Sequence, residues 1–439
     1  MRGSLAQLAQ RLGMPVGQDM KQTTALVLEA LSASPFRWLL VYDNAEGPEV
    51  LTDLVPSTGV GHVIVTSRNN AVWSARGNAI EVDVFERSES IQLLRRHGRS
   101  IGHGDADKLA DKLGDLPLAL EQAAIWHATT GMPVSEYLEL FDANIAELLS
   151  EGKPLDYPQT IYAFLKLAVH RLREELPAAA ELLELFAFLG PDPVSVTLLR
   201  AGRGGGLSEE LRAALNRPIE LNRAIREVRR FGLARVDEGQ RIQVHRLIQR
   251  VLKEELIGPR LEQSRDNAQR LLAAANPGYP DEQSNWPVHA EVAAHVDAAQ
   301  LVEATDDAAR MVVVDQIRYY FVIGDYEASR HLGEIVVDRW TKSDEPGSPG
   351  PDHELTLIAQ RHLANAYRLL GQTSKARRLD TDTFERLRRD PRFGEDHEHT
   401  LYTANNLGVD LRLEGLLADA LQVEEDNVAR HMRVLGADD

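Results

Sequence analysis

The chain has 439 residues, which suggests about three domains, and it carries 49 Lys and Arg against 67 Asp and Glu, a net charge of −18. This acidic balance argues against a general nucleic-acid binder, and the lack of Cys excludes disulfides, thiolate catalysis and Cys-ligated metal sites. No apolar run is long enough to span a membrane, and the first residues lack the apolar core of a signal peptide. We therefore expect a cytoplasmic protein without membrane contact.

The N-terminal part of the sequence predicts two helices followed by buried strands. Residues 4–13 and 23–34 show helical apolar periodicity. The short runs over 37–42 and 61–68 lack regular polar alternation, which is typical of parallel strands buried on both faces. A weaker third strand is predicted over 79–84.

The next segment predicts a helical subdomain. Helices are expected over 88–96, 105–113 and from Pro117 to about Thr130. Gly114 is expected to end one helix and Asp115 to cap the next, with Pro117 in its first turn.

Residues 158–258 are predicted to be mostly helical with one β-hairpin. The hairpin spans 232–244 and is followed by a helix over 247–256. Three helices and a small hairpin indicate a winged-helix unit. A local basic cluster lies here, and a solvated or interdomain face is favoured over a nucleic-acid surface. Its members are Arg226, Arg229, Arg230 and Arg235.

The C-terminal third contains an internal repeat. His353 recurs 44 residues later as His397, and Gly371 recurs as Gly415 with the same offset. Such a period predicts stacked helix pairs. We expect the first helices of two pairs over 355–370 and 400–415. The second helix of the last pair is expected over 424–435. His397 and His399 could suggest a metal pair, but the repetition of His353 favours a signature of the repeat loop.

The strongest chemical signal is an apolar run that ends in Asp43-Asn44. Asp43 would stand at the carboxyl end of a strand, where ligands bind in open α/β sheets and where a Walker-B Asp holds Mg²⁺. A turn or capping role for Asp43 is the alternative. The next predicted strand contains Thr66-Ser67-Arg68 and ends in Arg68, which could reach a terminal phosphate from the tip of the strand.

These elements, taken in order with two later motifs, resemble the NB-ARC branch of the STAND signalling NTPases. The later motifs are Gly114-Asp115-Leu116-Pro117-Leu118-Ala119-Leu120 and Val244-His245-Arg246-Leu247. The C-terminal repeats resemble tetratricopeptide repeats of the kinesin-light-chain type. The resemblance covers nearly the whole chain.

The resemblance implies a nucleotide site for ADP or ATP with Mg²⁺. By it, Asp43 would coordinate Mg²⁺, Arg68 would sense the terminal phosphate, Pro117 would pack near adenine and His245 would contact the ADP phosphate, while Asn44 and Leu118 fall within the same motifs. The plain alternatives are an ordinary helix start for Pro117 and a core or capping role for His245.

Two departures from the family weaken that site. The phosphate-cradling G-x-x-x-x-G-K-[ST] motif is missing, and the chain's only Gly-Lys pair, Gly152-Lys153, is followed by Pro154. Asn44 stands where many relatives carry a second acid. We therefore expect a chain without the front of its nucleotide-binding domain, as an expressed fragment, a truncated gene product or a misassigned start codon, and without ATP hydrolysis.

The predicted fold class is mainly α, with a truncated α/β subdomain of the P-loop type. The expected parts are a nucleotide-binding remnant (1–104), a helical subdomain (105–155), a winged-helix subdomain (156–258), a helical linker with a degenerate repeat (259–345) and tetratricopeptide repeats (346–439).

Three functions remain open at this point. The first is a regulatory STAND module whose repeats bind a protein or peptide, with self-association as a further interaction. The second is a pure repeat scaffold with a vestigial front end. The third and weakest is a winged-helix transcription regulator.

Overall fold

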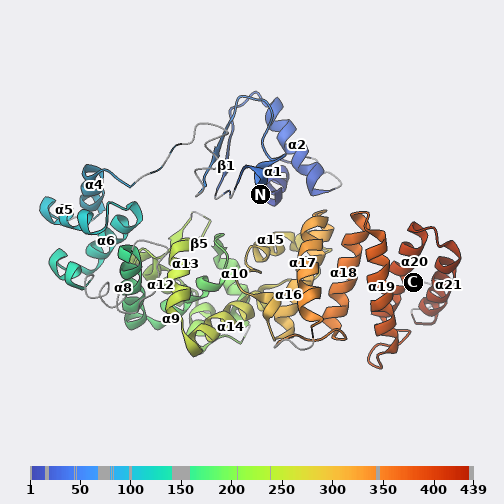
Figure 1. Cartoon of the computed structure of the whole chain (residues 1–439). Helices are drawn as coiled ribbons and strands as arrows, with labels where there is room; N and C mark the ends of the chain where they lie inside the picture. The colour runs from blue at the N-terminus through green and yellow to red at the C-terminus, as the bar shows by residue number, and fades with distance from the viewer. Residues whose placement is uncertain are drawn as a thin grey trace. The chain divides into compact units, whose positions relative to one another are not determined.

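The computed structural model is mainly helical, as predicted (Figure 1). The chain divides into two compact units. One consists of Met1–Asp83, Ile317–Asp338 and Thr356–Asp439, and the other of Val84–Gln316 and Arg339–Leu355. The structure describes residues 2–14, 19–43, 45, 47–67, 80, 82, 84–97, 101–140, 159–204, 206–237, 239–342 and 347–434. Among these residues, none of the helices is long and apolar enough to cross a membrane.

The N-terminal part of the first unit is a small α/β layer. Its two strands are parallel, with Leu39 opposite His62 and Tyr42 opposite Val65. Asp19 caps the second helix by accepting the Gln22 N–H at 2.7 Å. The elements are α1 (Arg2–Arg11), α2 (Met20–Ala33), β1 (Leu39–Tyr42), the 3-10 helix η1 (Pro48–Leu51) and β2 (His62–Val65).

One face of this two-stranded sheet packs against the helices. Leu40 and Val63 contact a core to which α1 and α2 contribute Leu5, Ala9 and Val27. The opposite face is exposed, with Leu39, Val41 and Ile64 each at least half accessible. The prediction of burial on both faces is therefore wrong for the described residues, because helices cover only one side.

The prediction of a third strand over 79–84 is also wrong for the described residues of that range. Ile80 and Val82 have no strand geometry, and their side chains are 86% and 93% exposed. Apolar residue type alone favoured a strand here, but no neighbouring strand pairs with these residues in the described part of the chain.

The second unit consists of helices and a small antiparallel sheet. The predicted hairpin forms between β4 and β5, and an unpredicted strand, β3, pairs with the other edge of β5. The strands are β3 (Val194–Ser195), β4 (Arg235–Val236) and β5 (Arg241–Gln243). The 3-10 helices are η2 (Phe186–Phe188), η3 (Gly202–Gly204), η4 (Gln283–Asn285) and η5 (Leu301–Glu303). The helices are α4 (Arg87–His97), α5 (His103–Lys112), α6 (Pro117–Thr130), α8 (Gln159–Glu175), α9 (Pro177–Leu185), α10 (Val196–Ala201), α11 (Glu209–Asn216), α12 (Pro218–Arg230), α13 (Arg246–Glu255), α14 (Gly258–Ala275) and α15 (Trp286–Ala293).

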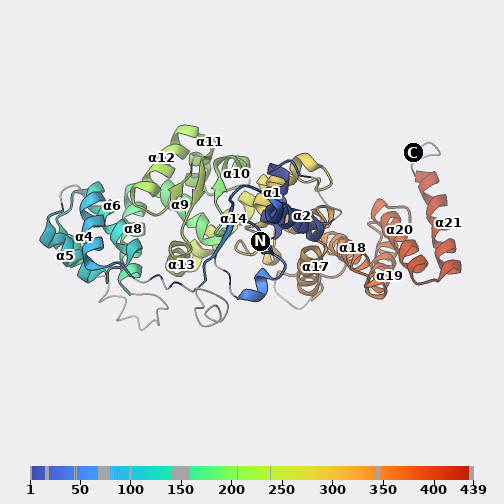
Figure 2. The ribbon, with the colours of Figure 1, turned by 90° about the horizontal axis from the view of Figure 1, so that it is seen from above.

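The C-terminal repeats form successive helix pairs, and α18 to α21 lie side by side in chain order (Figures 1 and 2). The first helices of the last two pairs begin and end within two residues of their predicted bounds. The final helix begins at Leu417 rather than at the predicted position 424. The helices are α16 (Asp307–Val322), α17 (Tyr326–Trp340), α18 (Glu354–Leu369), α19 (Thr373–Arg389), α20 (Glu398–Leu413) and α21 (Leu417–Val434).

The repeated glycines make the same turn in each pair. Gly324, Gly371 and Gly415 adopt φ values of 81°, 73° and 79°, a left-handed conformation that favours glycine. In each case the next N–H donates to the carbonyl five positions earlier, which is the pattern of a helix C-terminal motif. The bonds join Asp325 to Tyr320 (2.8 Å), Gln372 to Tyr367 (2.9 Å) and Leu416 to Leu411 (2.9 Å).

The repeated histidines also have equivalent roles. His353 Nδ1 accepts the Leu355 N–H at 3.3 Å, and His397 Nδ1 accepts the His399 N–H at 3.2 Å. Each ring therefore caps the start of the first helix in its pair. This confirms the interpretation of the His positions as a repeat-loop signature.

A buried ion network joins three helices of the array. Arg368 on α18 donates to Asp380 on α19 at 2.7 Å and to Asp410 on α20 at 2.5 and 3.1 Å. Asn365 accepts a further Arg368 bond at 2.6 Å and one from Asn406 at 3.1 Å. Both carboxylates are fully buried. Burial raises the pKa of Asp380, and the Arg368 charge opposes that shift.

We expect Gly371→Ala and Gly415→Ala each to lower the free energy of unfolding by about 1 kcal/mol. No heavy atom lies within 4 Å of the Cβ that either substitution would add, so the cost comes from the left-handed backbone alone. Urea unfolding followed by far-UV circular dichroism measures it. The control is Gly3→Ala, in the helical backbone of α1 with open space around it. A Gly415→Ala protein as stable as the wild type would contradict the prediction.

We expect Arg368→Ala to destabilise the array by about 3–5 kcal/mol, because it leaves two buried carboxylates without their cation. Chemical unfolding is again the measurement. The matched control is Arg386→Ala, whose exposed pair with Asp382 at 2.8 Å should change stability by less than about 0.5 kcal/mol. Similar losses for the two variants would show that the buried network does not stabilise the array.

Candidate functional site

The carboxyl ends of β1 and β2 bring two of the predicted motifs together. The Thr66 N–H donates to the Tyr42 carbonyl at 2.9 Å, and the Thr66 hydroxyl donates to Asp43 Oδ1. The Asp43 side chain is exposed at this edge. Sequence reasoning identified Asp43 and the Thr-Ser-Arg segment but gave Thr66 no role, although its position directly after β2 could have suggested one.

These residues do not form a complete magnesium or nucleotide site. Mg²⁺ in nucleotide sites is held by one or two carboxylates together with phosphate oxygens, and Asp43 with Thr66 supplies only part of that set. The described residues contain no group of three or more His, Asp or Glu placed to hold a metal. The 439 residues also contain no phosphate-cradling glycine motif. Asn44 and Arg68 lie outside the described residues.

The turn before Pro117 is fixed by an ion pair that the sequence did not predict. Gly114 and Asp115 both have positive φ, at 62° and 54°. Arg87 donates to the Asp115 carboxylate through Nε and Nη2, each at 2.9 Å, and thereby lowers the pKa of Asp115. The N-cap of α6 is Leu116, without a side-chain bond. The expectation that Asp115 caps α6 is therefore wrong, because its carboxylate binds Arg87 instead.

Pro117 is half-buried at the first turn of α6, as predicted for a helix start. Its helix packs against the region that leads into the β4–β5 hairpin. Gln122 donates to the Gly232 carbonyl, and the Trp126 and Phe231 rings meet edge to face at 5.8 Å. The adenine contact inferred for Pro117 stays a prediction, and the side chain of Leu118 lies outside the described residues.

His245 immediately precedes α13, and its carbonyl accepts the Gln249 N–H at 3.1 Å. Its side chain is exposed, so the alternative of a core histidine is wrong. The predicted phosphate contact of His245, and its position relative to Asp43 and Pro117, stay predictions.

The basic cluster on the second unit is partly neutralised. Arg230 pairs with Glu227 at 2.9 Å, and Arg235 pairs with Glu121 at the same distance. Carboxylates that already occupy these guanidinium groups would compete with a phosphate backbone. The arrangement favours the interpretation as a solvated face.

The Arg87–Asp115 pair should stabilise the turn that presents Pro117. We expect Asp115→Asn to lower the thermal midpoint of the protein, because Asn keeps the left-handed preference but loses the charge-assisted bonds. Since Arg87 lowers the pKa of Asp115, the stabilisation is complete above the ordinary carboxyl pKa and is lost as the pH falls toward the lowered value.

The matched control is Asp111→Asn. Asp111 also contacts Arg87, but at 3.3 Å and with a side chain that is 80% exposed. Calorimetry at neutral pH should show an unchanged midpoint for this variant. Equal midpoints for the two variants would exclude a specific role for Asp115.

Two sequence comparisons show which known proteins parts of this chain are similar to. A domain family described as a domain of unknown function (DUF7779) matches residues 168–261. A nucleotide-binding leucine-rich repeat (NLR)-like protein of Hyaloscypha variabilis is 29% identical over 160 aligned positions, covering 30% of this chain. The chain spans only 16% of the length of that relative.

A solved structure is also similar at low identity. It is a STAND protein, a signal transduction ATPase with numerous domains, with a tetratricopeptide-repeat sensor, from Pyrococcus horikoshii. It is 11% identical and covers 95% of this chain and 71% of its own, with a TM-score of 0.33. That score is too low to indicate a shared arrangement of the whole chain. The similarity to the NLR-like protein covers only part of either chain, and the repeats themselves are seen in the fold of this chain.

Proposed function

We propose that this chain is a STAND-type regulatory module whose C-terminal repeats bind a protein or peptide, and that these 439 residues do not hydrolyse ATP. The observation that carries the binding proposal is the array itself. Its helix pairs repeat the same glycine turn and the same histidine cap. Arrays of this kind expose extended surfaces that suit a polypeptide ligand.

The proposal on hydrolysis rests on the chemistry of phosphoryl transfer. Catalysis of this step depends on positioned donors that stabilise charge on the transferring group. The Asp43–Thr66 edge offers a carboxylate and a hydroxyl. The backbone cradle and the Lys that would contact the phosphates are missing from the sequence. A pure repeat scaffold is the alternative, and titration with ADP and ATP by calorimetry separates the two, because only the regulatory module should bind nucleotide.

Self-association, expected from the sequence, would use the final helix. Leu417, Leu421 and Met432 are exposed along α21. A second copy or a further helix could cover these side chains, and self-association stays a prediction.

We expect the chain with Mg²⁺ and ATP to release phosphate no faster than buffer. A coupled phosphate assay measures the rate. The variant Asp43→Ala identifies any activity that depends on the proposed edge, and Glu29→Ala, on the exposed surface of α2, controls for a nonspecific loss of charge. Turnover that is present in the wild type and in Glu29→Ala but lost in Asp43→Ala would overturn the proposal.

A further inference from the structure

A group of cationic and aromatic side chains lies on the first helices of the repeats. We name it the Arg361 cluster, and its members are Arg318 on α16, Arg361 and His362 on α18, and His399 and Tyr402 on α20. Arg361 lies 3.5 Å from His399 Nδ1, and its guanidinium carbon lies 5.5 Å from the centre of the Tyr402 ring. All of these residues except the exposed Tyr402 are partly buried.

Arg361 lacks a close counter-charge. Among the described residues, no carboxylate lies within ion-pair distance of its guanidinium. Asp380 and Glu398 attract it from further away, but the Asp380 carboxylate is already bound by Arg368. The neighbouring Arg318 adds positive charge, which helps to lower the pKa of Arg361 after the larger effect of burial.

The contrast with Arg368 shows that this arrangement is unusual within one helix. Two turns further along α18, Arg368 is also largely buried, yet it is bound by two carboxylates and an amide oxygen. A partly buried cation without such partners destabilises the protein. A site that keeps an unpaired cation despite this loss of stability is a candidate for ligand binding, because a ligand can supply the missing negative charge.

His362 points to the same conclusion. Its Nδ1 atom is buried and has no hydrogen-bond partner within the part of the chain that the structure describes. Burial, followed by the charges of Arg361 and Arg318, lowers the pKa of His362 well below its ordinary value. The cluster therefore contains a buried nitrogen without a hydrogen-bond partner beside a guanidinium without a close counter-charge.

We infer that the Arg361 cluster binds a side-chain carboxylate of an acidic peptide segment, and this inference rests on the proposed function of the repeats. The Arg361 guanidinium can bind a carboxylate through two parallel hydrogen bonds. The exposed ring of Tyr402 offers an apolar wall for the methylene groups of Asp or Glu. The net charge of −18 disfavours a long polyanion, but a short segment responds mainly to charges within about 8 Å at physiological salt.

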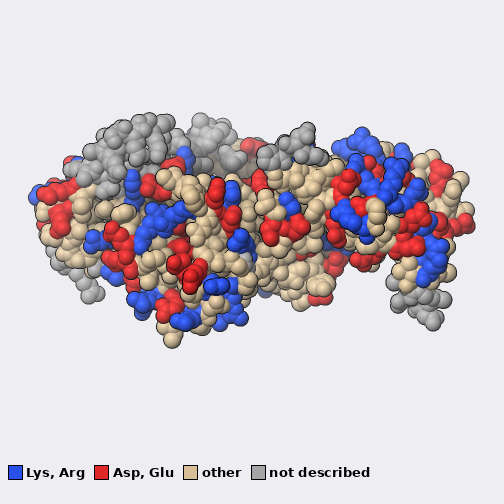
Figure 3. All heavy atoms as spheres, turned by 90° about the horizontal axis from the view of Figure 1, so that it is seen from below, with Lys and Arg blue, Asp and Glu red and all other residues tan. Residues whose placement is uncertain are grey.

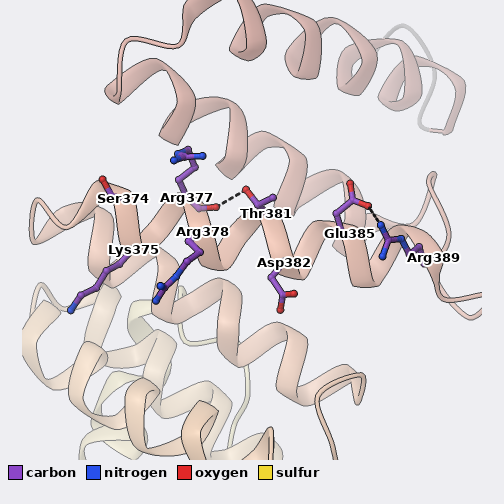
Figure 4. Close-up of a pocket in the computed structure, with 8 residues that line it drawn as sticks. All are labelled: Ser374, Lys375, Arg377, Arg378, Thr381, Asp382, Glu385 and Arg389. Carbon is purple, nitrogen blue, oxygen red and sulfur yellow. Dashed lines mark hydrogen bonds and ion pairs between the residues drawn. The ribbon is translucent and has the colours of Figure 1, made fainter.

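A second basic surface on the array is the weaker candidate. Basic and acidic side chains are interleaved over the C-terminal repeats (Figure 3), and a groove of about 780 Å³ runs along α19 (Figure 4). Two of its four cations are bound by carboxylates, Arg377 by Glu414 at 2.5 Å and Arg389 by Glu385 at 2.9 Å. The other two, Lys375 and Arg378, are exposed, so water can solvate their charges. The exposed Arg378 in this groove provides the matched control.

The first test measures binding of a fluorescein-labelled hexaglutamate peptide to the full chain by anisotropy, with labelled hexaglutamine as the neutral peptide. We expect hexaglutamate to bind and Arg361→Gln to weaken it roughly tenfold to a hundredfold, the range for charge-assisted bonds. Arg378→Gln removes the same charge and should leave binding unchanged. Equal effects of the two variants would overturn the inference.

A thermal melt separates binding from folding. Because Arg361 is a partly buried cation without a close carboxylate, Arg361→Gln should unfold at the same temperature as the wild type or higher. A lower midpoint would mean that Arg361 is a structural residue and would count against the inference. Arg361→Lys keeps the positive charge but cannot form the two parallel hydrogen bonds of a guanidinium to a carboxylate. This variant should bind hexaglutamate more weakly than the wild type.

Selection from a random peptide library on the full chain distinguishes failure of this inference from failure of the proposed function. Selected peptides rich in Asp and Glu that lose binding in Arg361→Gln support both. Peptides without acidic enrichment that still bind Arg361→Gln overturn the inference and leave the repeats as a peptide-binding array. If no peptide is selected and hexaglutamate does not bind, both proposals fail.

Discussion

The C-terminal array depends on one interaction, the pairing of the buried Arg368 guanidinium with two buried carboxylates. Arg368 meets carboxylates from the two following helices, Asp380 on α19 and Asp410 on α20, and neither carboxylate is accessible to water. Apolar packing is tolerant of small shifts between helices, whereas hydrogen bonds to a planar guanidinium are directional. The network therefore fixes how one repeat sits on the next, and any rearrangement of α19 against α20 would expose or unpair a charge.

The two arginines of α18 differ in whether their charge is paired within the described residues. At Arg368 the chain supplies every partner that the guanidinium needs, so this end of the helix is structural. At Arg361 the described residues supply none within ion-pair distance, although the environment is comparably buried. A repeat array stabilised by its own ion network can tolerate an uncompensated cation elsewhere, because the network and the repeated glycine turns hold the helices in place.

Features set by local chemistry could be predicted from the sequence, and features set by distant partners could not. The turns at Gly371 and Gly415 follow from residue type and period, and the structure confirms them. Burial on both faces of the N-terminal strands was wrong because an apolar run does not specify which layers cover it. Asp115 looked like a helix cap because its sequence neighbours allow one, but Arg87, 28 residues earlier, takes its carboxylate. Neither spacing nor periodicity indicates such pairs.

The two candidate sites differ in how much of their chemistry these residues contain. A ligand shifts a conformational equilibrium only by its difference in affinity for the two states. At the Asp43–Thr66 edge, a nucleotide would find a carboxylate and a hydroxyl but no cradle for its phosphates, so it would bind more weakly than at a site with that cradle. At the repeats, a carboxylate ligand would relieve an existing electrostatic cost at Arg361 in addition to making new contacts. On the proposed function, a partner that relieves this cost at the repeats would therefore bias a conformational equilibrium more strongly than a nucleotide at the Asp43–Thr66 edge would.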